Sequence, residues 1–530
     1  MSRRVWSAHL TLGTVGPACA PNHNGETAMP RGSVRAYGEE LDQFGFRDFD
    51  ADERNARATF RAEFTTQLFE SASTTSAVLA ELPWAEDVDL PDGLSNESLT
   101  KVEIADGSFG FVRSEHLIQI AYVKRRGTSD MKLKGVLRFD SGGKTQKREL
   151  IWGDMVQIIK KGASESQVRA RAFFGTMSNS ELSDEPLLEV YFVDVGQGDG
   201  VMVRTPDGRH LLVDGGLERS KQLTGKNAAD FVDWKFFTDY GDHRIRLDSM
   251  TASHSDNDHY GGLHDLVRAT PAADRELDCL GTEIGTLHHP GLSRWEKRDN
   301  SDPPHSDGLG PKKDGHFLRL LGNRADAEAS IVNGAENELS GPWMRLFRDV
   351  LNNSAKTTVQ RVGVALEHLR HGDPLPELWP TASGCSIRVL APVTVTRDDG
   401  THALPNLGKK SINTNGHSVC YRIDYKHARI LLTGDLNKKS MDWLRSCYGD
   451  RIGVFKCDVA KACHHGSHDI SYRFLEEMEP AATVISSGDA EGHGHPRPEI
   501  VGASAIAGFH SIDRETDKLV TPLIYMTEVE

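Results

Sequence analysis

The sequence lacks the features of a disulfide-stabilised, membrane-spanning or polyanion-coating protein. Its 530 residues include 7 cysteines, an odd number without a C-x-x-C pair, so we expect no disulfide framework and a reducing compartment. No run approaches about 18 continuous apolar residues, so we expect no membrane span. The net charge of −15 argues against a general nucleic-acid coat, although bound divalent cations would reverse the sign inside a pocket.

The N-terminus also lacks a convincing signal peptide. Met1-Ser-Arg3-Arg4 precedes a mildly apolar run that ends near Cys19, but this run contains His9, several hydroxyl residues and glycines. A secretory signal needs a more continuous apolar segment. We therefore favour a cytoplasmic protein, with secretion as the weaker alternative.

The length of the chain predicts two to four domains. Residues 1–58 show no sustained periodicity and are interpreted as an irregular arm with one short helix. Residues 187–530 alternate strand-like runs such as His210–Val213 and Ala428–Leu432 with helical segments such as Lys438–Cys447. Polar sequence at about 275–383, with helices expected near 341–353 and 355–371, is interpreted as an inserted lid or specificity element.

Residues 60–183 contain short β-like runs that repeat. The two copies place Trp84 and Trp152 at an offset of 68 residues (from 84 to 152) and their closing leucines, Leu117 and Leu182, at an offset of 65 (from 117 to 182). Such a repeat predicts two small β-barrels, at 60–122 and 130–183. Each copy resembles a bacterial SH3-like domain, which implies binding of a peptide, a cell-wall fragment or a neighbouring domain. The alternative is a passive β platform with its tryptophan in the core.

Candidate metal ligands follow several of the predicted strands. The run His254-Ser-Asp256-Asn-Asp258-His259 places four nitrogen or oxygen donors within six residues, which is more than a turn requires. Asp435 ends another apolar strand, and the pair His464-His465 follows a third. Strand ends of this kind meet at one edge of a sheet, so we expect these side chains to converge.

Further motifs complete the series. These are Asp194-Val-Gly-Gln-Gly-Asp199, Leu212-Val-Asp214-Gly-Gly, Asn415-Gly-His417-Ser418 and His493-Gly-His495-Pro. In this order, over roughly residues 187–510, the motifs resemble the metallo-β-lactamase superfamily, in particular the hydrolase domain of ComEC-type DNA-uptake proteins. The resemblance implies an α/β fold, the αββα sandwich, preceded here by the small all-β barrels. The chain lacks the membrane helices of that family, and the extra segment in its middle leaves the substrate open.

The resemblance also implies two adjacent divalent metal ions. One ion would be bound by His254 and Asp256, the other by Asp258, His259 and one histidine of the His464-His465 pair, with His465 favoured. Asp435 would bridge the two ions, and His417 is a further candidate for the first. Because Asp256 stands where many relatives have histidine, the site is richer in oxygen, which favours Mn²⁺ relative to Zn²⁺.

Other residues are expected to assist catalysis. Lys461 is either a ligand for a phosphate oxygen or a lysine that extends from the strand end to solvent. His464 and His495 are expected beside the substrate, and Asp258 is expected to be essential. A last group is expected to order loops, orient ligand histidines or contact substrate: Asp194, Asp199, Asp214, Asn415 and Ser418. The pair His288-His289 is expected in an exposed loop.

Three hypotheses for function follow. The first is a phosphodiesterase or nuclease, possibly acting on DNA, in which two metal ions activate a hydroxide nucleophile. The second is hydrolysis of a small phosphoester such as a cyclic nucleotide or phosphorylcholine. The third is a non-catalytic scaffold that the SH3-like modules tether to a peptide or protein partner.

Overall fold

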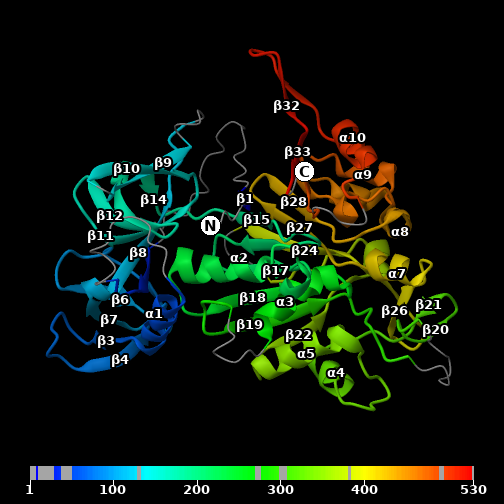
Figure 1. Ribbon diagram of the computed structural model, residues 1–530, viewed down its shortest axis with the longest axis horizontal. Coiled ribbons are helices and arrows are strands. Elements are labelled where there is room, and N and C mark those ends of the chain that lie inside the picture. The colour runs from blue at the N-terminus through cyan, green and yellow to red at the C-terminus, as the bar shows by residue number, and fades with distance from the viewer. Residues whose placement is uncertain are drawn as a thin grey trace.

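The computed structural model describes residues 7–9, 29–37, 50–127, 133–141, 143–268, 276–297, 307–379, 384–488 and 494–527. A β-rich N-terminal region, blue to cyan in Figure 1, lies to one side of a larger α/β domain. Among the described residues, no helix combines the length and apolar character needed to cross a bilayer.

The α/β domain is built on two sheets. In the first, β15, β16 and β17 are antiparallel, and β17, β18, β19 and β22 are parallel. Its spatial order is β1 (Ser7–His9), β15 (Glu189–Val193), β16 (Val201–Arg204), β17 (His210–Val213), β18 (Ile245–Thr251), β19 (Thr282–His289) and β22 (Thr358–Arg361). The second follows the order β24 (Cys385–Ala391), β27 (Cys420–Tyr425), β28 (Ala428–Leu432), β29 (Val459–Lys461), β30 (Ala482–Ile485) and β33 (Leu523–Met526).

Alternation along the strands assigns their two faces to different cores. Val190 and Phe192 of β15 join the core that includes the second sheet, whereas Tyr191 and Val193 join the core beneath the helices of the first. The helices of this second core are α2 (Ala228–Trp234), α3 (Asn257–Val267) and α5 (Gly341–Asn353). The second sheet packs with α8 (Lys438–Tyr448), α9 (Tyr472–Met478) and α10 (Pro498–Ala507). The expected α/β domain with two sheets between helical layers is therefore present.

The interpretation of residues 275–383 as an insertion is wrong for much of the segment. β19 and β22 extend the first sheet, and α5 packs against α3. His288 and His289 consequently lie buried at the end of β19 rather than in an exposed loop.

Only one of the two helices expected in this segment forms as predicted. Residues 341–353 are α5, but 355–371 contain β22, β23 (Val364–Ala365) and the short α6 (Leu366–His371). β-branched residues and alternating burial around Val359 favour the strand. The remainder of the segment contributes α4 (Arg324–Ser330), β20 (Lys312–Lys313) and β21 (His316–Phe317). β20 pairs with β21, β21 pairs with β26 (His402–Pro405) beyond the segment, and β26 pairs with β25 (Val393–Thr396).

The N-terminal region shows the repeat in the order of its elements. Two strands, three further strands, a 3-10 turn and a last strand occur twice. The first copy comprises β3 (Thr65–Phe69), β4 (Val78–Pro83), β5 (Asp87–Asp89), β6 (Leu99–Glu103), β7 (Phe109–Arg113) and β8 (Leu117–Val123). The second comprises β9 (Lys134–Ser141), β10 (Lys144–Ile151), β11 (Met155–Lys160), β12 (Glu165–Ala170), β13 (Phe173–Ser178) and β14 (Leu182–Ser183).

The two tryptophans occupy equivalent positions, as the offset predicts. The backbone N–H of Trp84 donates to Phe64 at 3.2 Å, and that of Trp152 donates to Leu133 at 2.7 Å. Each accepting carbonyl belongs to the residue just before the first strand of its copy. The structure therefore confirms the equivalence of the two tryptophans.

The copies are not two independent barrels, however. β8, the last strand of the first copy, pairs with β11 of the second copy and with β2 (Arg31–Val34), so the strands of both copies belong to one hydrogen-bonded sheet. In the described part of residues 1–58 the expected short helix is present, but two strands form where an irregular arm was expected. β1 pairs with β15 of the first α/β sheet, β2 pairs with β5 and β8 of the first copy, and α1 (Ala51–Glu63) begins at a capping box on Asp50.

The N-terminal region packs against one short segment of the α/β domain. The π-helix η6 (Lys235–Tyr240) and the residues after it offer backbone carbonyls to side chains of both copies. Trp84 Nε1 donates to Gly241 at 2.8 Å, and Gln157 Nε2 donates to Tyr240 at 2.8 Å. Trp84 is 1% exposed, whereas Trp152 is half-buried beneath the guanidinium of Arg125. The first tryptophan therefore serves an internal interface.

We predict that Trp84→Phe lowers the free energy of unfolding by about 1–3 kcal/mol, because the smaller benzene ring leaves a cavity and the buried Gly241 carbonyl loses its donor. Trp152→Phe is the matched control in the other copy and should cost less. Urea denaturation followed by circular dichroism measures both variants. Equal losses would contradict the assignment of Trp84 to this interface.

Candidate metal centre

Donor side chains from both sheets converge where their central strands end. Asp214 follows β17, and the run from His254 to His259 links β18 to α3 in the first sheet. Asp435 follows β28, and His464 and His465 follow β29 in the second sheet. The predicted convergence of strand ends is therefore present, and it lies across the two sheets rather than along one.

Glycines let the segments approach closely enough. A Cβ at Gly198 would lie 1.8 Å from the carbonyl oxygen of Asp258, and one at Gly262 would lie 2.0 Å from that of Gly215. Asp214, His464 and His465 adopt left-handed backbone conformations, with φ of 59°, 49° and 52°. Non-glycine residues in that region are strained, and such strain clusters at functional sites.

A single carboxylate oxygen lies at the middle of the cluster. Oδ2 of Asp435 is 3.3 Å from Nε2 of both His259 and His465. The same oxygen is 3.7 Å from Nε2 of His464 and 4.0 Å from Nε2 of His254. This arrangement brings Asp435 within reach of every histidine predicted to bind metal except His417, as its expected bridging position requires.

The spacing within one half of the cluster suits a tetrahedral ion. Nε2 of His259 and Nε2 of His465 are also 3.3 Å apart, so these two nitrogens and Asp435 Oδ2 form an equal-sided triangle. Ligands about 2.0–2.1 Å from a tetrahedral ion lie about 3.3 Å from one another. Asp258 Oδ2 lies 3.6 Å from His465 Nε2, which places the fourth candidate donor beside this triangle.

The other half contains His254, Asp256 and His464. Oδ2 of Asp256 is 3.7 Å from His254 Nε2, while its Oδ1 accepts from the guanidinium of Arg294. Asn415 contacts Nε2 of His464 at 3.2 Å and, with its amide oriented to satisfy both neighbours, donates to Asp256 at 2.8 Å. Arg294 and Asn415 therefore compete with a metal ion for the carboxylate of Asp256.

Residues behind the histidines orient them. Nδ1 of His259 donates to Asp214 at 2.8 Å, and Nδ1 of His465 donates to the Ser486 carbonyl at 3.1 Å. Nδ1 of His254 lies 3.2 Å from Ser418 Oγ, which also accepts from the backbone N–H of Asp435. These contacts direct each Nε2 toward the cluster, in the supporting role that the sequence predicts for Asp214 and Ser418.

Lys461 has neither of the two roles expected for it. Its side chain is 2% exposed, forms an ion pair with Asp199 and lies 3.9 Å from Asp435 Oδ1. Burial raises the pKa of Asp199, but Lys461 and His465 outweigh burial and lower it to about 2. Lys461 is therefore a positioning residue that keeps Asp199 ionised beside His465, where Asp199 Oδ1 is 3.2 Å from Nδ1.

The field of the cluster attracts cations. Burial lowers the pKa of His465, but Asp435 and Asp199 outweigh burial and raise it to about 10. Burial likewise opposes the charged form of His259, yet Asp435, Asp214 and Asp258 raise its pKa well above the usual value. Nε2 of His254 and Oδ1 of Asp435 are buried without hydrogen-bond partners among the described residues. Buried, partnerless donor atoms in a negative field fit bound divalent ions.

Three other residues predicted for the site, His417, His495 and Asp194, differ in where the structure places them. His417 follows α7 (Lys410–Gly416) and its Nε2 donates to the Pro405 carbonyl at 2.8 Å, so its prediction as a ligand is wrong. The ring of His495 lies 5.9 Å from that of His464, centroid to centroid, at the side of the cluster. Asp194 accepts from the backbone N–H of Gly196 at 3.2 Å and orders its loop as expected.

Sequence reasoning missed two residues that touch predicted ligands. Arg294 contacts Asp256, and Gln197 Nε2 donates to Asp258 Oδ2 at 3.2 Å. Gln197 lies within the motif Asp194-Val-Gly-Gln-Gly-Asp199, so the sequence did indicate that it could belong to the site. Arg294 lies in the segment interpreted as an insertion and belongs to no motif.

Comparisons with known proteins give one family match and several partial similarities. Residues 193–318 match the family model described as the metallo-beta-lactamase superfamily. The competence protein ComA of Neisseria gonorrhoeae is 37% identical over 89 residues, which are 17% of this chain and 12% of that protein. Zn²⁺-bound PqqB of Methylobacterium extorquens is similar over 59% of this chain and 83% of that one, at 10% identity and a TM-score of 0.29. A CmlA beta-hydroxylase mutant is similar over 62% and 51%, at 12% identity and a TM-score of 0.26.

We predict that the purified chain binds two divalent ions and that Asp435→Asn binds fewer than one, because the substitution keeps the shape but removes the shared charge. Mass spectrometry of protein-bound metal after Mn²⁺ or Zn²⁺ loading measures both values. Asp399→Asn, in a turn away from the cluster, is the control and should retain two ions. Two ions in Asp435→Asn would contradict the bridging assignment.

Proposed function

We propose that this chain, which carries a metallo-beta-lactamase superfamily domain, is a two-metal phosphodiesterase and that DNA is its first candidate polymer. The domain supports a metal-dependent hydrolase. The observation that carries the proposal is the position of Asp435 Oδ2 between histidines of both halves of the cluster. Such a site suits two adjacent ions, the arrangement used for in-line displacement at phosphorus.

Cationic side chains beside the cluster favour an anionic substrate. Arg294 contacts Asp256, and Lys410, at the start of α7, is close enough to Arg294 and Asp256 for their charges to act on it. Burial lowers the pKa of Lys410, and the like charges of Arg294 and Lys297 lower it further. Like charges held together gain stability from an anion bound between them. A phosphodiester backbone supplies such an anion next to the bond to be cleaved.

The bound ions would supply a nucleophile at neutral pH and stabilise charge on the transferred group. The protein's own residues position the ligands, bind the substrate and supply a proton. Asp214, Ser418 and Ser486 keep the histidine rings aimed at the cluster, and Lys461 keeps Asp199 ionised. Arg294 and Lys410 bind substrate oxygens, and His495, beside His464, donates a proton to the leaving oxygen.

The similarity to a competence protein supports testing DNA first, although the match covers 12% of that protein. Hydrolysis of a small phosphoester is the second candidate, favoured by the net charge of −15, which disfavours long polyanions away from the site. A peptide or protein partner of the SH3-like copies, and the choice between Mn²⁺ and Zn²⁺, remain predictions.

A substrate panel tests the proposal. Metal-loaded protein is incubated with single-stranded DNA, duplex DNA, RNA, a cyclic nucleotide, phosphorylcholine and bis(p-nitrophenyl) phosphate, each with an EDTA control. Cleavage of a nucleic acid that EDTA abolishes supports the proposal. Cleavage of the small esters alone would favour the second candidate, and no cleavage of any substrate would favour a scaffold.

We predict that Asp258→Ala abolishes cleavage of bis(p-nitrophenyl) phosphate but leaves the fold intact, because Asp258 is a partly exposed metal-donor candidate in the first turn of α3 rather than a core side chain. Initial rates measure the loss, and circular dichroism measures the fold. A wild-type rate in this variant would refute the assignment.

We also predict that Arg294→Gln raises KM for an oligonucleotide about 10-fold, because it removes a charge-assisted contact. Its effect on bis(p-nitrophenyl) phosphate, which has no flanking phosphates, should be smaller. Arg397→Gln, in a turn beside Asp399, is the matched control. Metal content is measured in parallel, since Arg294 also contacts Asp256. Equal changes on both substrates would show that Arg294 acts on the metals alone.

A further inference from the structure

Exposed apolar side chains gather at one corner of the α/β domain. Among the described residues, 15 large apolar side chains are exposed, and seven of them lie between residues 506 and 525. They come from the end of α10, from the strands β31 (Ser511–Asp513) and β32 (Lys518–Thr521), and from β33: Ile506, Phe509, Ile512, Leu519, Val520, Leu523 and Tyr525. A concentration of exposed apolar residues of this size marks an interaction surface.

Part of this surface is a hairpin that projects from the domain, here called the arm (residues 511–521). Among the described strands, β31 and β32 pair only with each other, and Figure 1 shows them extending outward beyond α10. Ile512 lies opposite Leu519, and the two residues are 60% and 62% exposed. An isolated two-stranded hairpin is at best marginally stable in water. The arm therefore needs another surface to pack against.

The base of the arm is fixed to the domain. The backbone N–H of Phe509 donates to the Pro480 carbonyl at 3.0 Å, and that of Leu523 donates to the Ala481 carbonyl at 2.9 Å. A Cβ at Gly508 would lie 2.6 Å from Cβ of Pro522, so the two ends of the arm are in close contact. The arm is thus held away from its own domain and presents its apolar residues to another molecule.

The strand that follows the arm is the edge of the second sheet. β33 pairs with β30 and is the last strand in the order of that sheet, so one of its edges has no neighbouring strand in the described part of the chain. Leu523 and Tyr525, on one face of β33, are exposed. Exposed apolar edge strands are templates for pairing with a strand of another chain.

The charge of the arm favours a second copy of this chain as that molecule. The arm carries a net charge of −1 in a chain of −15, from two basic and three acidic residues: Arg514, Lys518, Asp513, Glu515 and Asp517. Near neutrality lets two copies approach here, and the mixed signs can pair with those of an identical arm. An anionic lipid surface would call for a surplus of basic residues, and lipid tails cannot bond to the free edge of β33.

We propose that the arm and β33 form a two-fold symmetric interface between two copies of this chain. The two β33 strands pair edge to edge, and each arm covers Ile506 and Phe509 of the other copy. The seven residues expose on the order of 700 Å², close to the 800 Å² or so that each partner buries in a standard interface. The two-fold axis brings an arm and a base to each copy at once, which closes the assembly at two chains. The interface requires no metal ion, so it is independent of the proposed catalytic function.

Sedimentation velocity of the wild-type chain over a range of micromolar concentrations tests the proposal, and we expect twice the mass of one chain. Ile512→Asp and Leu519→Asp should each sediment as a monomer, because each would bury an unpaired charge in the interface. Leu223→Asp, at an 85% exposed position outside the arm, is the matched control and should remain a dimer. Circular dichroism should show all three variants folded, since the substituted side chains are exposed.

Other outcomes would overturn the proposal. A wild-type chain that stays monomeric at every concentration would do so, and binding of that monomer to phosphatidylcholine vesicles would assign the arm to a lipid surface instead. Dimers that persist in both arm variants would place the interface elsewhere. Hydrogen exchange tests the strand pairing: amides of β33 should exchange more slowly in the wild-type chain than in Leu519→Asp. Equal exchange would overturn the edge-to-edge pairing.

Discussion

The buried carboxylate of Asp435 is the constraint on which the catalytic domain depends. One of its oxygens lies within 4.0 Å of four histidine nitrogens, and further carboxylates surround the same rings. Concentrating negative charge away from water is unfavourable unless cations neutralise it. In the protein alone, Lys461 and protonated histidines do so, as the raised pKa of His465 indicates. Divalent ions would replace those protons, which explains why the fold tolerates so many acids in its centre.

The scaffold makes this concentration of charge possible by sharing it between two sheets. Neither sheet alone contributes enough donors, because His259 follows a strand of the first sheet while Asp435 and His465 follow strands of the second. Glycines such as Gly198 and Gly262 let the connecting backbone approach to contact distance. Left-handed backbone at His464 and His465 then directs two consecutive imidazoles to the same centre. The packed strands on either side hold the backbone in this strained conformation.

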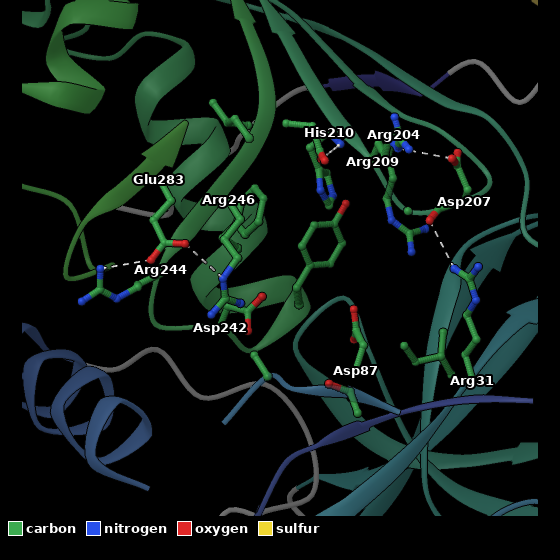
Figure 2. A pocket seen from close by; sticks show the side chains of 18 of the residues that line it. Arg31, Asp87, Arg204, Asp207, Arg209, His210, Asp242, Arg244, Arg246 and Glu283 are labelled. Carbon is green, nitrogen blue, oxygen red and sulfur yellow. Dashed lines mark hydrogen bonds and ion pairs between the residues drawn. The ribbon is translucent and has the colours of Figure 1, made fainter. Parts of the chain in front are cut away.

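The N-terminal region packs at the end of the first sheet opposite to the metal cluster. It binds η6 through side-chain hydrogen bonds to backbone carbonyls, and the Trp84 ring packs in a cluster with Tyr37, Ile118 and Phe174. The interface is thus specified by polar contacts around an aromatic centre. Next to this interface, a cavity lined by charged residues separates the N-terminal region from the α/β domain (Figure 2). The two equivalent tryptophans therefore differ in role: Trp84 stabilises the interface, whereas Trp152 is half-buried in its own copy.

Sequence patterns alone predict several strands of the α/β domain, the order of its motifs, most of the donor residues that converge at the cluster and the equivalence of the two tryptophans. These features depend on local patterns, since a strand with its donor at the end can be recognised without its neighbours. Only the tertiary structure decided that β19 and β22 belong to the first sheet, that His417 turns toward Pro405, and that Lys461 is buried against Asp199. It also brought Arg294 to Asp256 and opened the cavity between the two parts. The direction of a side chain and the meeting of distant segments depend on packing across the whole core, which no local pattern encodes.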